Sequence, residues 1–289
     1  MKKLILLALF SASFIAARVN AQTFSYNNDF PNNLIGTASR PESAGKIEIE
    51  SADDFLPIST LTQITGGTFT GLIPSGATIE QVRVEIYRVF PNDSDISRTS
   101  GPPTFSPSQV PTRVNSPADV AFADRDSTSG NLSFTTTLLN ANFTALNSVL
   151  NGINPIPNQT TMGEGPITGQ EIRFNVNFTT PFNLPADHYF FIPQVELAGT
   201  DNFFWLSSER PIISGTPFLP DLQSWIRNAN LDPDWLRIGT DIVGGNPAPT
   251  FNGSFSLVGT VVPDSGSTVV LFSGSMLALF FLRRRMRVQ

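Results

Sequence analysis

The chain contains no cysteine, and His188 is the single histidine among its 289 residues. The absence of cysteine excludes disulfide bonds, thiol catalysis and cysteine-ligated zinc. One histidine cannot build a metal centre from several imidazoles. The Gly-x-Ser-x-Gly motif that positions the nucleophile of many hydrolases is also missing. The common cysteine and histidine chemistries are therefore excluded, and His188 is expected to be structural.

Basic residues are scarce in the middle of the chain. Seven of the 18 basic residues lie before residue 22 or after residue 265, which leaves 11 basic against 24 acidic residues, a formal charge of −13 over residues 22–265. Such a surface repels nucleic-acid phosphates and anionic lipid headgroups, and it favours cations or neutral glycans. We therefore expect no nucleic-acid partner.

The chain begins with the sequence MKKLILLALFSASFIAARVNAQTF. Two lysines precede an apolar run, residues 4–17, that is short for a membrane span, and Val-Asn-Ala at 19–21 supplies the residues that a signal peptidase reads. This pattern predicts a signal peptide over residues 1–21, cleavage before Gln22, and export of the remaining chain.

A second apolar segment lies near the other end. No charged residue occurs from Ser265 to Leu282. As a helix this segment is about 27 Å long, against about 30 Å of bilayer hydrocarbon. Arginines beside such a span mark its cytoplasmic side. The pattern predicts a transmembrane helix with a cytoplasmic basic flank made of Arg283, Arg284, Arg285 and Arg287.

A short motif precedes this apolar segment, formed by Val262, Pro263, Asp264, Ser265 and Gly266. A VPDSG motif, an apolar helix and an arginine cluster in this order resemble the C-terminal sorting signal of PEP-CTERM proteins. The resemblance is confined to residues 261–289. It implies processing by an exosortase, a membrane-embedded cysteine transpeptidase of Gram-negative bacteria that make extracellular polysaccharide. It also implies transient membrane anchoring, followed by release or transfer to the cell surface.

Between the two ends, β-strand patterns dominate. Apolar and polar residues alternate with a period of two, or apolar residues run together between turn signals, at 46–50, 82–90, 171–178, 188–193, 202–206 and 252–260. We predict one all-β domain over residues 22–260, an antiparallel two-sheet sandwich with long loops at 97–111 and 154–169 and with many of the 24 phenylalanines in its core. Helix is expected only at residues 141–150 and 221–228.

A second resemblance concerns residues 51–71, SADDFLPISTLTQITGGTFTG. This stretch resembles the Asp-Asp-Phe opening of jelly-roll-like β-sandwich modules in secreted bacterial proteins. It implies a jelly-roll-like arrangement of the two sheets, and it implies nothing about a ligand.

Acidic turns offer oxygen ligands of the kind that calcium prefers. The four candidate ligands are Asp93, Asp95, Asp124 and Asp126. They come from two separate segments, and no complete EF-hand loop surrounds them. Bound calcium and ordinary solvated turns are both compatible with this pattern.

Two tryptophans stand in polar, loop-rich stretches and are candidates for sugar binding. Aromatic rings flanked by amide and carboxylate groups can stack on sugars, which gives Trp225 and Trp235 a possible role in holding a glycan. The alternative is core packing, the more common fate of tryptophan, and it is what we expect for Trp205 in its apolar run.

These observations leave three hypotheses for the function. The first is a non-catalytic surface or matrix protein that binds or organises extracellular polysaccharide. The second is a secreted polysaccharide-active hydrolase, which would need two facing carboxylates. The third is a structural surface protein without a ligand. The candidate acids for a hydrolase are Glu164, Glu171, Glu196, Asp232 and Asp234.

Overall fold

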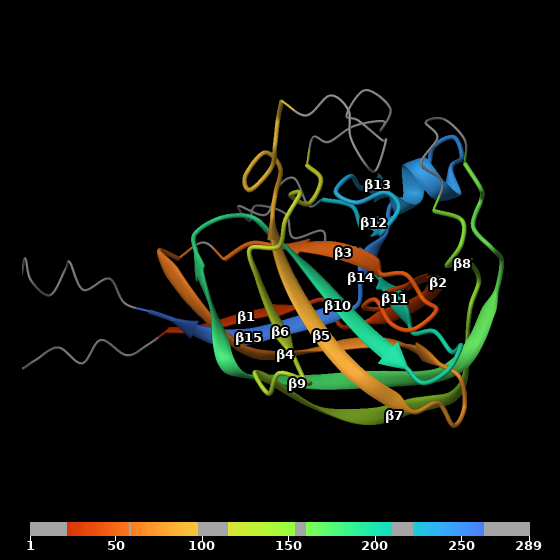
Figure 1. Cartoon of the computed structure of the whole chain (residues 1–289), viewed down its shortest axis with the longest axis horizontal. Coiled ribbons are helices and arrows are strands. Elements are labelled where there is room, and N and C mark those ends of the chain that lie inside the picture. Colours follow the sequence, from red (N-terminus) through yellow and green to blue (C-terminus); the bar gives the residue numbers. More distant parts are fainter. Residues whose placement is uncertain (1–21, 58, 98–114, 154–159, 210–221, 263–289) are drawn as a thin grey trace, which may run out of the picture.

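The computed structural model describes residues 22–57, 59–97, 115–153, 160–209 and 222–262, which form two β-sheets packed face to face (Figure 1). The larger sheet contains β1 (Gln22–Asn27), β2 (Pro31–Ala38), β4 (Leu61–Ile73), β7 (Leu132–Ala145), β8 (Ser148–Val149), β9 (Ile167–Pro185), β11 (Phe204–Ser208), β14 (Asn252–Gly253) and β15 (Phe255–Val261). The smaller sheet contains β3 (Ile49–Phe55), β5 (Ile79–Arg88), β6 (Ala123–Asp126), β10 (Tyr189–Leu197), β12 (Trp225–Asn228) and β13 (Leu236–Arg237). The all-β prediction and the two-sheet prediction are confirmed.

The long strand β4 organises the larger sheet. β9 pairs with β4 along one side, while β15 and β11 share its other side. β7 lies beyond β9, β1 lies beyond β15, and β2 and then β8 lie beyond β11. Every pairing in this sheet is antiparallel except that of β2 with β8. The smaller sheet runs in the order β13, β12, β3, β10, β5, β6. The jelly-roll-like arrangement stays a prediction.

Aromatic side chains fill the space between the sheets. Phe255 of β15 stacks on Phe191 of β10, with ring centroids 4.7 Å apart and planes inclined by 7°. Within the larger sheet, Phe69 of β4 stacks on Phe174 of β9 at 4.8 Å. Trp205 packs edge-on against Phe255 and is buried, as expected. These rings join the sheets because large aromatic surfaces dominate the energetics of apolar cores.

Both helix predictions are wrong. Residues 141–145 end β7, and 148–149 form β8, because the chain there pairs with β9 and β2 instead of bonding to itself. Residues 225–228 form β12 against β3, and 221 lies outside the described residues. The helix that the described chain does contain is a short π-helix, η1 (Ile238–Val243). Tertiary pairing has overridden local helix propensity in both segments.

Each predicted strand segment contributes to a strand, although the first one does so only at its end. Residues 46–48 lead into β3, which begins at Ile49. The Asp-Asp-Phe stretch lies within β3 and is buried throughout. Much of the predicted loops at 97–111 and 154–169 lies outside the described residues, and 167–169 belong to β9. No helix in the described part of the chain is long and apolar enough to cross a membrane, and the predicted C-terminal span falls outside that part.

We predict that Phe255→Ala destabilises the domain by about 3–5 kcal/mol, because the change leaves a cavity between the two sheets. Urea unfolding of residues 22–262 measures the effect. Val258→Ala is the matched control, since Val258 lies on the same strand with 49% of its surface exposed, and it is expected to change stability by less than about 0.5 kcal/mol. Equal effects of the two substitutions would contradict the interpretation of Phe255 as the link between the sheets.

Candidate functional site

The first and last strands of the described domain lie side by side (Figure 1). Gln22, the first residue after the predicted cleavage site, is the antiparallel partner of Val261. The next amide, that of Val262, donates a hydrogen bond of 2.9 Å to the carbonyl oxygen of Leu61. The sheet therefore holds the chain up to the first residue of the VPDSG motif. The rest of the motif, 263–266, and the four arginines lie outside the described residues.

The outer face of the larger sheet carries an array of hydroxyl and amide side chains. Antiparallel register and period-two alternation place these residues together across five adjacent strands. We call this array the hydroxyl–amide face. Its members are Thr23, Ser25 and Asn27 of β1, Ser256 and Thr260 of β15, Gln63 and Thr68 of β4, Asn175, Asn177 and Asn183 of β9, and Ser133, Thr135 and Thr137 of β7. Val258 of β15 is an exposed apolar residue among them.

Hydrogen bonds between neighbouring strands organise this face. Thr68 and Ser256 share a hydroxyl–hydroxyl bond of 2.7 Å. The amide of Gln63 donates to Asn183 at 3.0 Å, and other such bonds link β9 with β7. The polar groups are therefore arranged at the spacing of adjacent strands, about 4.8 Å. Much of their hydrogen-bonding capacity still points to solvent, because most of these side chains are exposed or half-buried.

The charges bordering the hydroxyl–amide face largely cancel. The guanidinium of Arg173 lies 2.8 Å from the buried carboxylate of Asp29. Asp29 also accepts hydrogen bonds from the hydroxyls of Thr68 and Thr70, at 2.6 and 2.7 Å. Near one end of the face, burial raises the pKa of Glu171, which favours its neutral form. The face is thus close to neutral in a domain whose overall charge is strongly negative.

The outer face of the smaller sheet has the opposite character, because ionic groups are buried there. Arg227 forms an ion pair with Glu50, donates a 2.8 Å hydrogen bond to the Tyr87 hydroxyl, and lies 4.4 Å from the ring centre of Trp235. Burial opposes ionisation of Glu50, but the charge and hydrogen bonds of Arg227 outweigh it and hold the pKa of this carboxyl below its ordinary value.

Glu85 lies beside this pair, and its pKa is shifted in the opposite direction to that of Glu50. Burial, reinforced by the negative charge of Glu50, raises the pKa of Glu85 well above its ordinary value, despite a 2.5 Å contact with Arg83. Two neighbouring carboxyls with opposed pKa shifts can also occur in hydrolases. Here, however, both side chains are buried, so neither is open to a polysaccharide. We interpret the cluster as an ionic element of the fold.

The prediction that tryptophan rings form a sugar-binding platform is corrected by their burial. Trp225 is 1% exposed and Trp235 is 2% exposed. Trp225 lies in β12, and the indole nitrogen of Trp235 donates to the Ala118 carbonyl at 3.0 Å. Both rings belong to a small core on the smaller sheet, together with Tyr87 and Phe190. At this degree of burial, neither ring offers a face to a glycan.

The four aspartates suggested for calcium do not converge. Among the described residues, no group of three or more acidic, histidine or cysteine side chains is arranged to hold a metal ion. Asp93 faces Arg88 at 3.7 Å, and Asp95 accepts hydrogen bonds from Ser97. Asp126 accepts a bond from Gln81, and Asp124 lies opposite Glu85 in the sheet. The solvated-turn interpretation therefore fits Asp93 and Asp95, whereas it is wrong for Asp124 and Asp126, which lie in strand β6.

The acids considered for a hydrolase are also engaged separately. Glu164 accepts backbone amides of the 150–152 turn, and Glu196 pairs with Lys46 at 2.5 Å. Asp232 pairs with Arg227. The remaining two acids, Glu171 of β9 and Asp234, are buried.

His188 occupies a structural position at the start of β10. Its Nε2 atom lies 2.6 Å from the carboxylate of Asp54 at the end of β3, and Asp54 also accepts the amide of Leu222 at 3.1 Å. The histidine thus links neighbouring strands of the smaller sheet, as expected for a structural residue.

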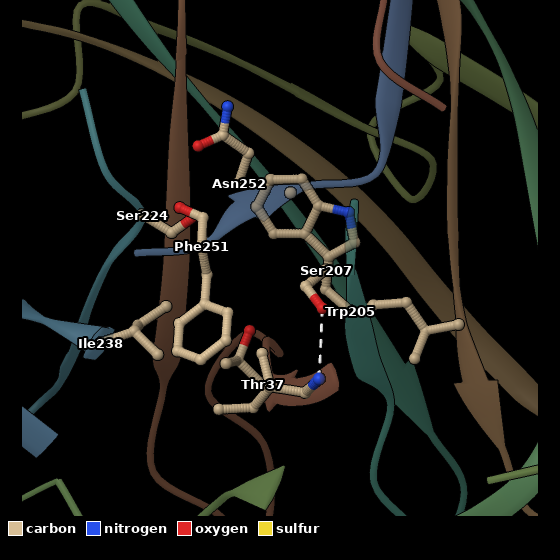
Figure 2. A pocket seen from close by; sticks show the side chains of 10 residues that line it. Thr37, Trp205, Ser207, Ser224, Ile238, Phe251 and Asn252 are labelled. Atoms are coloured by element: carbon tan, nitrogen blue, oxygen red, sulfur yellow. Dashed lines mark hydrogen bonds between the residues drawn. The ribbon is translucent and has the colours of Figure 1, made fainter. Parts of the chain in front are cut away.

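A small cavity lies between the sheets beside Trp205 (Figure 2). Figure 2 shows Thr37, Ser207 and Ser224 around it, with Phe251 on one side. It leaves about 10 Å³ for the centre of a water molecule, which is room for one water. A sugar ring cannot enter it.

Comparison with known proteins identifies the C-terminal tail. Residues 261–286 match the VPDSG-CTERM motif. This motif is typical of secreted proteins that are anchored at the surface through exosortase, and it implies processing by an exosortase-like enzyme. The sorting signal recognised in the sequence is therefore confirmed. No curated protein and no solved structure matches the chain.

The hydroxyl–amide face is not predicted by the sequence. Its local signal is weak, because polar residues alternate with apolar ones in 173–177, as in any half-buried strand, and run together in 135–137. Only the register of five strands brings these positions onto one surface.

The raised pKa of Glu85 predicts a pH-dependent effect on stability. Above the ordinary glutamate pKa of 4.5, the unfolded chain has released this proton while the folded chain retains it. Glu85 therefore lowers stability progressively as the pH rises from about 4.5 towards its folded pKa. Glu85→Gln removes this loss, so the stability of the variant relative to the parent should increase over this range.

Urea unfolding midpoints between about pH 4.5 and 7.5 test this prediction. Glu80→Gln is the matched control, because Glu80 is exposed on the same strand. A stability difference between Glu85→Gln and the parent that stays constant with pH would refute the assignment.

Proposed function

We propose that this chain is a non-catalytic surface protein that is exported, processed at its VPDSG tail, and binds a neutral extracellular polysaccharide through the hydroxyl–amide face. The observation that carries the proposal is the near-neutral array of hydroxyl and amide groups across five strands of a domain with a formal charge of −13. Such groups can donate to and accept from sugar hydroxyls without desolvating a charge.

The charge distribution favours this ligand class over others. The acidic domain repels anionic polymers at long range, whereas a neutral chain meets no such barrier. The hydroxyl–amide face offers no cluster of lysines or arginines for an acidic glycan. Its extent across β1, β15, β4, β9 and β7 suits a polymer that lies along or across the strands rather than a small molecule in a pocket.

Two parts of the sequence hypothesis change as a result. The binding surface moves from the buried tryptophans to the larger sheet. The hydrolase alternative has less support, because the one closely coupled carboxyl pair described above, Glu50 with Glu85, is buried. The calcium site suggested for Asp93, Asp95, Asp124 and Asp126 is not carried forward, because these side chains form no group that could hold a metal ion.

Affinity electrophoresis of the purified domain in gels containing the producing cell's own extracellular polysaccharide tests the proposal. We expect the parent to be retarded, and Asn175→Glu with Asn177→Glu to reduce the affinity about tenfold, because the new carboxylates must be desolvated against the sugar. The matched control is Asn230→Glu, an exposed position on the smaller-sheet side, which should bind as the parent does.

Parallel measurements on the same samples distinguish glycan binding from the hydrolase, calcium-dependent and structural hypotheses. Release of reducing sugars by the parent would favour a hydrolase, and loss of binding in EDTA would point to calcium. Equal retardation of the double variant and the parent would remove the hydroxyl–amide face as the binding surface. No retardation of the parent on any neutral glycan would favour a structural protein without a ligand.

A further inference from the structure

β7 forms a long border of the larger sheet. It pairs with β9 along one side, and no other strand in the described ranges pairs along its second side. In Figure 1 it lies along the lower border of the molecule, outside β9. Sheet borders are usually protected by charged residues, proline or short length. β7 is 14 residues long, LSFTTTLLNANFTA, and contains neither a charged residue nor a proline.

The core-facing side of β7 also lacks a neighbour. Leu138 lies opposite Ile172 in the register and shares its face of the sheet. Ile172 is buried, whereas Leu138 is 52% exposed. The difference arises because β9 has a strand on each side, while β7 has only one. A further strand beyond β7 would cover Leu138.

The uncharged, self-complementary border favours a second copy of this chain as the occupant. Two domains that each carry a formal charge of −13 repel one another over most of their surfaces, so close approach is favoured where charge is absent. β7 is such a place. An antiparallel border strand is also complementary to itself, because a two-fold axis aligns its free amides and carbonyls with those of its copy.

We propose that β7 pairs antiparallel with β7 of a second copy about a two-fold axis at Thr135. The ladder between β7 and β9 is regular from Leu132 to Leu138 and shifts register after Leu138. Pairing of this regular stretch with its copy places each Leu138 opposite the other copy's Leu132, and each Thr135 opposite its own equivalent. The irregular part of β7 bends the strand and ends the pairing.

The dimer has two consequences for the rest of the molecule. It joins two larger sheets into one, so the two hydroxyl–amide faces become one continuous surface.

It also reverses the second copy, because antiparallel pairing rotates the sheet by half a turn. The two ends that carry Gln22 and Val261 then point in opposite directions. Two copies anchored in one membrane by their tails cannot adopt this antiparallel arrangement, whereas copies free of the membrane can. The proposal does not depend on glycan binding.

The absence of cysteine makes disulfide trapping a direct test. The full-length chain with Thr135→Cys is produced in a bacterium without the polysaccharide, and it is oxidised both in isolated membranes and after extraction into detergent. Opposed residues of antiparallel strands have Cβ atoms about 4.5–5.5 Å apart, close enough for a disulfide after small adjustments. Non-reducing electrophoresis measures the dimer.

We expect the detergent-extracted Thr135→Cys chain to form at least about tenfold more disulfide dimer than Asn175→Cys, since the latter places the thiol on β9, one strand away from the border. A mixture of Ser133→Cys and Thr137→Cys should also cross-link, because these positions face each other across the axis. Equal yields at positions 135 and 175 would overturn the proposal. Equally strong trapping of Thr135→Cys in intact membranes would overturn the antiparallel geometry.

A second substitution tests the contact itself. Leu138→Lys in the Thr135→Cys chain should lower the dimer yield about tenfold, because a charge on a strand border opposes pairing. Leu146→Lys is the control, since Leu146 is 57% exposed just beyond β7, and it should leave the yield unchanged. An unchanged yield with Leu138→Lys would count against the pairing, provided that protease resistance shows both variants to be folded.

Discussion

The stacking of Phe255 on Phe191 is the contact on which the rest of the structure depends, because it joins the last strand of the domain to the opposite sheet. β15 lies between β1 and β4, so the centre of the larger sheet is complete only when the residues just before the sorting tail are in place. The first strand then closes over the last one. The chain thus leaves the fold beside the point where it entered.

The aromatic layer between the sheets also decides what the outer faces can do. Because alternate residues point inward and are apolar, the remaining residues of each strand are available to solvent or to a covering segment. On the smaller sheet they form the buried cluster around Arg227 and Glu50, which is covered by the chain near Trp235. On the larger sheet they stay uncovered and almost uncharged. One scaffold therefore carries a buried ionic cluster on one outer face and an almost uncharged, largely exposed surface on the other.

The sequence predicted what is local and missed what depends on pairing. Alternation in 82–90 and 171–178 identified strands, since that pattern reports which side of a strand is buried. The same local reasoning failed for 141–150, where pairing with distant strands overrode helix propensity, and for Trp225, whose polar neighbours concealed a buried ring. The tail was recognised because its motif is contiguous. The hydroxyl–amide face and the β7 border arise from strands far apart in sequence, so no local pattern could reveal them.

The positions of the tail and the β7 border connect processing with assembly. The sheet holds the chain as far as Val262, and two residues, 263 and 264, lie between it and the predicted membrane span at 265–282. If anchored copies share one orientation, the proposed antiparallel pairing through β7 would be blocked while the tail is in place. Removal of the anchor ends that restriction. Processing would then permit dimerisation, and each dimer would present two hydroxyl–amide faces as one surface. Two linked sites would bind one polymer more tightly than either site alone, so the proposed release would strengthen the proposed glycan binding.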